Sequence, residues 1–145
     1  MAEEMLTLEK FEEASETVKK VTQETKLVYS DYFSAATGNK VYLKPENMQF
    51  TGAYKLRGAY YKISTLTEEE RSRGLITASA GNHAQGVALS GRELGIRSVI
   101  VMPVTTPSIK VEAVRGFGGE VVLHGENFDA AQARARQLAE EEGLE

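Results

Sequence analysis

Apolar residues follow two alternating patterns along the chain. In the first, apolar positions recur every three or four residues, which is typical of a helix with one buried face. In the second, short runs rich in apolar residues are bounded by turn residues, which is typical of a strand. The helical pattern covers residues 8–21, 31–36, 54–65, 67–73, 82–94, 106–115 and 128–141. The strand pattern covers residues 41–43, 75–78, 98–102 and 120–123, and residues 28–29 lead into the second helix.

Turn and capping residues stand at the ends of several of these segments. Thr7 is placed to cap the first helix, Gly38 and Gly74 follow two of the shorter ones, and Pro107 stands at the expected first position of another. From residue 75 onward, strands and helices alternate regularly. This order predicts an α/β fold, an open parallel twisted sheet with helices on both faces. Such sheets bind ligands at the carboxyl ends of their strands.

Composition narrows the class of protein. The chain has 145 residues, of which 41% are hydrophobic and 26% charged, the balance of an ordinary globular domain. Its net charge of −4 argues against a nucleic-acid partner. The absence of cysteine excludes disulfides and a cysteine nucleophile. Neither repeats nor a linker interrupt the sequence, so it predicts one domain or part of one.

The N-terminus and the hydropathy pattern bear on location. Residues 1–5 (Met-Ala-Glu-Glu-Met) are acidic and contain no apolar segment of signal-peptide length. No stretch approaches the roughly 20 apolar residues that cross a membrane. We therefore expect a cytoplasmic protein with no membrane partner.

Lys55 is the first candidate for chemistry. It lies in the run Thr-Gly-Ala-Tyr-Lys-Leu-Arg-Gly-Ala, residues 51–59, where a helical pattern begins. The first turn of a helix carries partial positive charge, which disfavours an ammonium ion and favours the neutral, nucleophilic amine. Arg57 would act in the same direction if it lay close to Lys55. The placement suits a Schiff-base lysine; the alternative is an ordinary solvated lysine.

A second candidate segment follows the strand at residues 75–78. The run Ser-Ala-Gly-Asn-His-Ala-Gln-Gly, residues 79–86, leads from that strand into a helix. Backbone N–H groups at a helix start, together with the Ser79 hydroxyl and the Asn82 amide, form a receptor for a carboxylate or phosphate. The turn has neither the lysine of a nucleotide P-loop nor a Gly-x-Gly-x-x-Gly pattern. The alternative is a structural turn capped by Ser79 or Asn82.

Together, the two runs resemble the threonine dehydratase group of pyridoxal-phosphate enzymes, which includes threonine ammonia-lyases and serine racemases. The resemblance extends to Tyr-Leu-Lys-Pro-Glu-Asn at residues 42–47 and Val-Ile-Val-Met-Pro at residues 99–103. It implies the fold-type II architecture, like that of the tryptophan synthase β chain. Because such enzymes are longer, residues 1–145 are expected to be the N-terminal portion of a catalytic domain. The glycine-rich loop that holds the cofactor phosphate would lie downstream.

The resemblance also implies roles for individual residues around pyridoxal 5'-phosphate. Lys55 would bond covalently to the cofactor and, once released, carry the α-proton of the substrate. Asn82 would hydrogen-bond the ring hydroxyl oxygen of the cofactor, and Tyr54 would lie against the cofactor where the family often has Phe. Ala53 stands where many members have Ser, which puts a hydrogen bond beside Lys55 in doubt.

The resemblance assigns the amino-acid substrate to the turn after the strand. Its carboxylate would be held by hydroxyl and backbone donors of Ser79, Ala80, Gly81, Asn82 and His83. The implied reaction is β-elimination of a hydroxy amino acid to a 2-oxo acid and ammonia. Threonine would give 2-oxobutanoate, the first step towards isoleucine, and serine would give pyruvate.

Alternatives remain open at this point. The chain alone is either such a lyase or a non-catalytic fragment that retains a ligand cleft, and a serine racemase-like enzyme is a further reading. A β-replacement synthase fits less well, because that group tends to have Asp after the lysine and this chain has Leu56.

His124 has no partner at metal-ligand spacing, so no metal site is predicted. An incomplete sheet would leave a strand edge open and favour a homo-oligomer.

Overall fold

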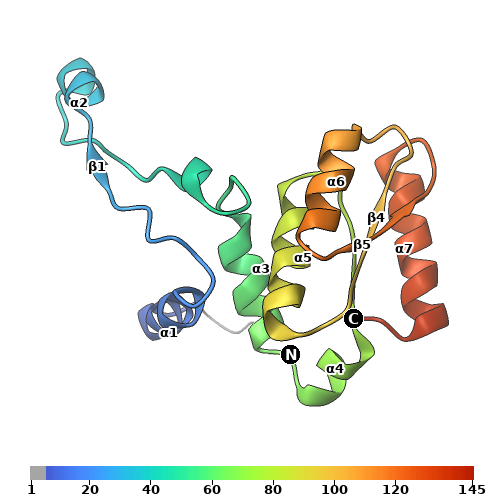
Figure 1. Ribbon diagram of the computed structural model, residues 1–145. Helices are drawn as coiled ribbons and strands as arrows, with labels where there is room; N and C mark the ends of the chain where they lie inside the picture. Colours follow the sequence, from blue (N-terminus) through green and yellow to red (C-terminus); the bar gives the residue numbers. More distant parts are fainter. Residues whose placement is uncertain (1–5) are drawn as a thin grey trace.

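The N-terminal part of the protein forms an extended arm. In the computed structural model, which describes residues 6–145, the arm comprises α1 (Leu8–Val18), β1 (Val28–Tyr29), α2 (Asp31–Thr37), β2 (Tyr42–Leu43) and the 3-10 helix η1 (Glu46–Met48) (Figure 1). The strands β1 and β2 pair antiparallel. The rings of Tyr29 and Tyr42 contact edge to face, with their centroids 5.3 Å apart. The acidic residues 1–5, on which the expectation of no signal peptide rests, lie outside the described residues.

The remainder of the chain forms an α/β unit. It begins with α3 (Lys55–Ser64) and α4 (Glu68–Arg73) and continues with β3 (Leu75–Ala78), α5 (Asn82–Leu94), β4 (Ser98–Met102), α6 (Ser108–Gly116), β5 (Glu120–Leu123) and α7 (Phe128–Glu142). The three strands form a parallel sheet in the order β3-β4-β5. The predicted α/β fold with a parallel sheet is confirmed.

Helices cover both faces of this sheet. The helices α5 and α6 pack on one face and α7 packs on the other (Figure 1). Successive residues of a strand point to opposite faces, and β4 has apolar residues in both directions. Ile100 is buried against the α5 side and Val101 against α7, both fully. The central strand therefore anchors two separate apolar layers.

The last residue of the chain lies beside β3. After α7, Gly143 takes a left-handed conformation (φ 69°) and Leu144 is buried. The backbone N–H of Glu145 donates to the carbonyl of Gly74 at 3.0 Å, and the N–H of Ile76 donates to the carbonyl of Glu145 at 2.6 Å. These two bonds are the pattern of a parallel ladder. Hence β3 has paired neighbours on both sides at its amino end.

Three details differ from the sequence-based expectations. The first helix ends at Val18, although Val21 in the following turn is buried as its periodicity predicted. Pro107 does not begin a helix, because its ψ of 137° is extended, and α6 starts at Ser108. The short strands β1 and β2 pair with each other, apart from the parallel sheet. No helix in the part of the chain that the structure describes is long and apolar enough to span a membrane.

Candidate active site

Lys55 is the first residue of α3, as the sequence predicted, and its side chain is exposed. The next residue, Leu56, is completely buried and fixes this end of the helix. A Cβ atom at Gly86 of α5 would lie 3.4 Å from the Cα of Leu56, so the two helices approach closely here. The small residue at this crossing allows the backbone of α3 to pack close to α5. This packing fixes the position of the helix start, and with it the position of the Lys55 backbone.

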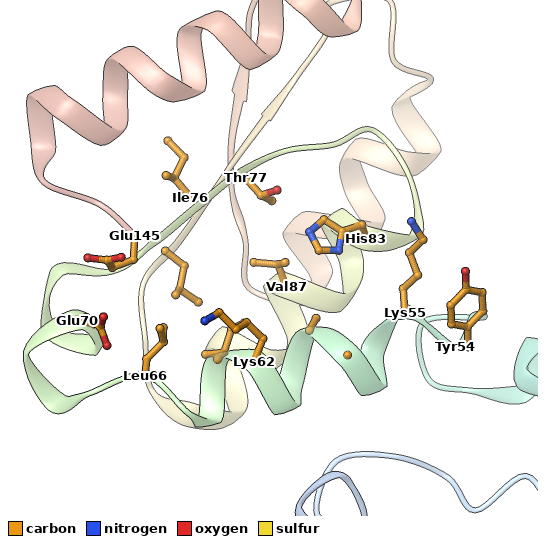
Figure 2. Close-up of a pocket in the computed structure, with 14 residues that line it drawn as sticks. Tyr54, Lys55, Lys62, Leu66, Glu70, Ile76, Thr77, His83, Val87 and Glu145 are labelled. Atoms are coloured by element: carbon orange, nitrogen blue, oxygen red, sulfur yellow. The ribbon is translucent and has the colours of Figure 1, made fainter. Parts of the chain in front are cut away.

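Lys55 lines a pocket of about 620 Å³ between α3, α5 and β3. Tyr54 and His83 line the same pocket, and apolar side chains from both helices form its wall: Ala59, Ile63 and Val87. Figure 2 shows Lys55 and His83 at one end of the pocket, and Glu70 and Glu145 at the other. The volume lies within the range of small-molecule sites, roughly 300–1,000 Å³.

His83 stands in the first turn of α5 and is half-buried. Burial lowers its pKa below the ordinary value of 6.5, and the positive charge of Lys55 lowers this pKa further. Both causes disfavour the imidazolium ion. The neutral imidazole is therefore favoured, in which one ring nitrogen can donate a hydrogen bond and the other can accept one.

The turn of residues 79–82 lies at the carboxyl end of β3. Ser79 extends the sheet by one bond, its N–H donating to the carbonyl of Val101 at 3.1 Å. The Ser79 hydroxyl accepts from the N–H of Gly81 at 3.4 Å. Gly81 is the N-cap of α5 and no side chain caps the helix, so the structural alternative of a cap by Ser79 or Asn82 is not what the fold uses. Asn82 is the first helical residue and is exposed.

Three of the seven predicted site residues thus share one pocket, and the other four form the adjacent turn. Lys55, Tyr54 and His83 line the pocket, whereas residues 79–82 lead from β3 into α5. The pocket and the turn meet at His83, which belongs to both the pocket lining and the first turn of α5. Two segments distant in sequence therefore converge on one cleft.

The condition under which Arg57 would act on Lys55 is not met, because Arg57 pairs with Glu46. Its guanidinium group binds both carboxylate oxygens of Glu46, with Nε–Oε2 at 3.0 Å and Nη2–Oε1 at 2.8 Å. The hydrogen bond from Arg57 is the largest cause that lowers the pKa of Glu46, to about 2. The charge of Arg57 is compensated by Glu46 and is not directed at Lys55.

Sequence reasoning missed Lys62 as a residue of the pocket. Lys62 lies on α3 and lines the same pocket as Lys55. The signal was available, because residues seven apart are two turns apart and share a helix face.

A further pocket of about 890 Å³ lies between α1 and α3 and contains none of the predicted site residues. Within residues 6–145, no group of three or more His, Cys, Asp or Glu side chains is placed to hold a metal ion.

Two further features of the sequence have structural roles. Gly118 takes a φ of +90° just after α6, so the glycine-rich run at residues 116–119 ends that helix and forms a turn. Tyr60 is buried on α3, and Tyr61 packs against the same apolar cluster.

Comparison with known proteins gives a consistent result. A family model described as pyridoxal-phosphate dependent enzyme matches residues 18–144. The chain is 55% identical over 130 residues to a biosynthetic L-threonine dehydratase of Pasteurella multocida, covering 90% of this chain and 25% of that protein. It is 50% identical over 139 residues to an L-threonine ammonia-lyase of Thermotoga maritima, covering 96% of this chain and 35% of that protein. The chain thus spans about a quarter to a third of the length of these relatives.

Solved structures show the same likeness. The processed form of threonine deaminase isoform 2 from Solanum lycopersicum is 44% identical, with a TM-score of 0.85 over 97% of this chain and 42% of that one. Maize serine racemase is 33% identical, with a TM-score of 0.87 over 94% of this chain and 42% of that one.

Proposed function

Because this chain belongs to the family of pyridoxal-phosphate dependent enzymes, we propose that it is the lysine-bearing part of a threonine ammonia-lyase. The observation that carries the proposal is the convergence of Lys55 and His83 on one pocket beside the turn of residues 79–82. The relatives of highest identity named above are a threonine dehydratase and a threonine ammonia-lyase, which supports this substrate class. The reaction converts a hydroxy amino acid to a 2-oxo acid and ammonia.

The residues of the pocket fit pyridoxal 5'-phosphate. The Lys55 amine can bond to an aldehyde, and the apolar side chains of Ala59, Ile63 and Val87 can cover one part of a ring. Burial and the charge of Lys55 lower the pKa of His83, which favours the uncharged imidazole in the pocket. When bound, the cofactor makes the α-proton of an amino acid acidic by drawing electrons away from the α-carbon.

The predicted residues would then have distinct tasks. The Nζ atom of Lys55 would hold the cofactor and, once free, accept the α-proton. Tyr54 would lie against the cofactor, and the Asn82 amide would hydrogen-bond the ring hydroxyl oxygen.

The substrate carboxylate is assigned to the turn after β3. The uncapped N–H groups at the start of α5 and the Ser79 hydroxyl supply donors where the helix dipole favours an anion. Ala80 contributes a backbone N–H group and His83 a ring donor, and the N–H of Gly81 would exchange its long 3.4 Å bond to the Ser79 hydroxyl for one to the carboxylate. Side-chain capping would have consumed such donors, and its absence at Gly81 supports this assignment.

Reductive labelling tests the proposal. The purified protein is mixed with pyridoxal phosphate, reduced with borohydride and digested, and the labelled lysine is mapped. We expect a single labelled site at Lys55, and no specific label in Lys55→Ala. The matched control is Lys62→Ala, which removes the second lysine of the same pocket and should leave the label at Lys55 intact. Label scattered over many lysines would contradict the proposal.

A serine racemase-like activity is the second candidate, supported by the structural likeness to maize serine racemase. Product analysis separates the two, because a lyase releases ammonia and a 2-oxo acid from threonine or serine, whereas a racemase gives D-serine. A non-catalytic fragment would bind ligand and give neither product. Cytoplasmic location, assembly into a homo-oligomer and a role in isoleucine biosynthesis are parts of the same proposal.

A further inference from the structure

The ion pair of Arg57 and Glu46 joins three separate segments of the chain. Besides its two bonds to Glu46, the Arg57 guanidinium donates to the carbonyl of Gln23 at 3.1 Å and to the hydroxyl of Thr25 at 3.2 Å. The hydroxyl of Thr25 in turn donates to Glu46. The segment after α1, the segment that contains η1 and the first turn of α3 therefore meet at one guanidinium group.

Arg57 and Lys55 point to different sides of α3. Two residues along an α-helix correspond to a rotation of about 200° around its axis. Lys55 consequently lines the pocket while Arg57 faces the N-terminal arm. Arg57 can thus fix α3 from the side that faces the N-terminal arm, without lining the pocket of Lys55.

The ion pair also closes a loop around Lys55. Glu46 precedes Lys55 in the chain and Arg57 follows it, so their contact ties together the two ends of residues 46–57. Within this loop, Gln49 is buried and its side-chain amide bonds both the N–H (3.0 Å) and the carbonyl (2.7 Å) of Gln23. The loop is therefore fixed to the arm at two points before the chain reaches Lys55.

We propose that the Arg57–Glu46 ion pair is a positioning device for Lys55, which holds the loop of residues 46–54 and the first turn of α3 in one arrangement. The inference rests on the proposed function, since it assigns Lys55 the bond to the cofactor. Arg57 and Glu46 do not touch the reacting atoms; they act on Lys55 through the backbone on either side of it.

The geometry of the pair favours a positioning role over a charge effect alone. Both side chains are largely covered, with exposed fractions of 28% for Arg57 and 16% for Glu46. A bidentate guanidinium–carboxylate contact fixes direction as well as distance, and an ammonium group cannot reproduce it. Arg57→Lys keeps the charge and loses the fork, so it separates the two contributions.

The test compares four folded proteins in the labelling reaction: the wild type, Glu46→Gln, Arg57→Lys and the double variant. The matched control is Glu120→Gln, which breaks the exposed Arg97–Glu120 pair on the sheet, away from Lys55. The measured quantity is the rate at which pyridoxal phosphate with borohydride labels Lys55, relative to the rate at Lys55 in the wild type. Circular dichroism restricts the comparison to conditions in which each protein is folded.

We expect each single variant to lose about tenfold in the relative rate at Lys55, since small misplacements of a reacting group are costly. The double variant should lose no more than either single one, because the two residues act as a unit. Glu120→Gln should match the wild type. Equal rates in Glu46→Gln and the wild type, or an equal loss in the control Glu120→Gln, would overturn the proposal.

Hydrogen exchange gives a second reading that does not involve the cofactor. In Glu46→Gln the backbone amides of residues 50–56 should exchange at least about tenfold faster, while those of residues 86–91 in α5 remain protected. If pyridoxal phosphate does not label Lys55 in the wild type, the proposed function is wrong. The exchange experiment alone then tests whether the Arg57–Glu46 ion pair positions the backbone around Lys55. Unchanged exchange at residues 50–56 would then contradict the positioning role.

Discussion

Lys55, the first residue of α3, and His83, in the first turn of α5, line one pocket, and the charge of Lys55 lowers the pKa of His83. The two residues come from helices that pack directly on each other. A change at one is therefore measurable at the other, and this allows the site to be examined without any ligand.

The pKa of His83 should lie below 6.5 in an NMR titration of the imidazole ring. In Lys55→Ala this pKa should rise but stay below 6.5, because burial is the larger cause and persists. Lys62→Ala is the control, and His124→Gln assigns the signal, since the chain has two histidines. A His83 pKa at or above 6.5 in the wild type would contradict the described burial.

The depressed pKa of His83 also has a consequence for stability. The unfolded chain binds a proton at His83 near pH 6.5, whereas the folded protein binds it only at lower pH. The unfolding free energy contributed by this residue therefore decreases as pH falls below 6.5. Urea titrations at pH 7.5 and 5.5 should show a smaller decrease in His83→Gln than in the wild type.

Glu46 should dominate a second pH-dependent step. Its folded pKa of about 2, against an ordinary value of 4.5, corresponds to about 3 kcal/mol of stability. Because the folded pKa is depressed, this stability is present above about pH 4.5 and is lost as pH falls towards 2. Glu46→Gln should remove that part of the pH dependence. Parallel stability curves for Glu46→Gln and the wild type between pH 5 and 2 would exclude this role.

Two glycines inside helices should respond in opposite directions to alanine. A Cβ atom at Gly91 of α5 would lie 2.9 Å from the carbonyl oxygen of Ile96 and 2.6 Å from the Ser98 hydroxyl, so Gly91→Ala should cost about 1–3 kcal/mol. Gly58 of α3 has open space, and Gly58→Ala should stabilise by about 0.5–1 kcal/mol. Chemical denaturation measures both; a neutral Gly91→Ala would argue against the close approach.

The arm should promote self-association through its exposed apolar side chains. The exposed large apolar residues between residues 27 and 43 are Leu27, Val28, Tyr29, Tyr32, Phe33, Tyr42 and Leu43. Light scattering should show an average mass that rises with protein concentration. Tyr32→Ser should reduce this rise, whereas Ile109→Ser, an equally exposed residue on α6, should not. A constant mass across concentrations would contradict the prediction.

Much of the α/β unit was predictable because its signals are local. The glycine after α4, the apolar runs of β3 and β4 and the helical periodicity of α5 each lie within a few neighbouring residues. The turn that leads from β3 into α5 within residues 79–86 was predictable for the same reason. Element ends were less certain, as Pro107 shows, since ψ at a helix boundary depends on the local path of the chain.

Long-range pairings were not predictable from the same patterns. Arg57 would act on Lys55, two residues away, only if the two side chains lay close, but its partner is Glu46, and Gln23 and Thr25 accept further hydrogen bonds from it. The pairing of β1 with β2 is another example, because strands of two residues carry too little pattern to identify a partner. In both cases tertiary packing selects among partners that local sequence leaves equivalent.

The position of Glu145 shows where the winding of the sheet changes direction. From β3 the chain winds through α5 to β4 on one side, and α7 later returns it to the opposite side of β3 at Glu145. The direction of winding thus reverses at β3, with α5 on one face of the sheet and α7 on the other. In open α/β sheets, ligands bind outside the carboxyl ends of the strands at such a reversal. A ligand site beside the turn of residues 79–82 is therefore favoured by the order of the strands and does not depend on any single side chain.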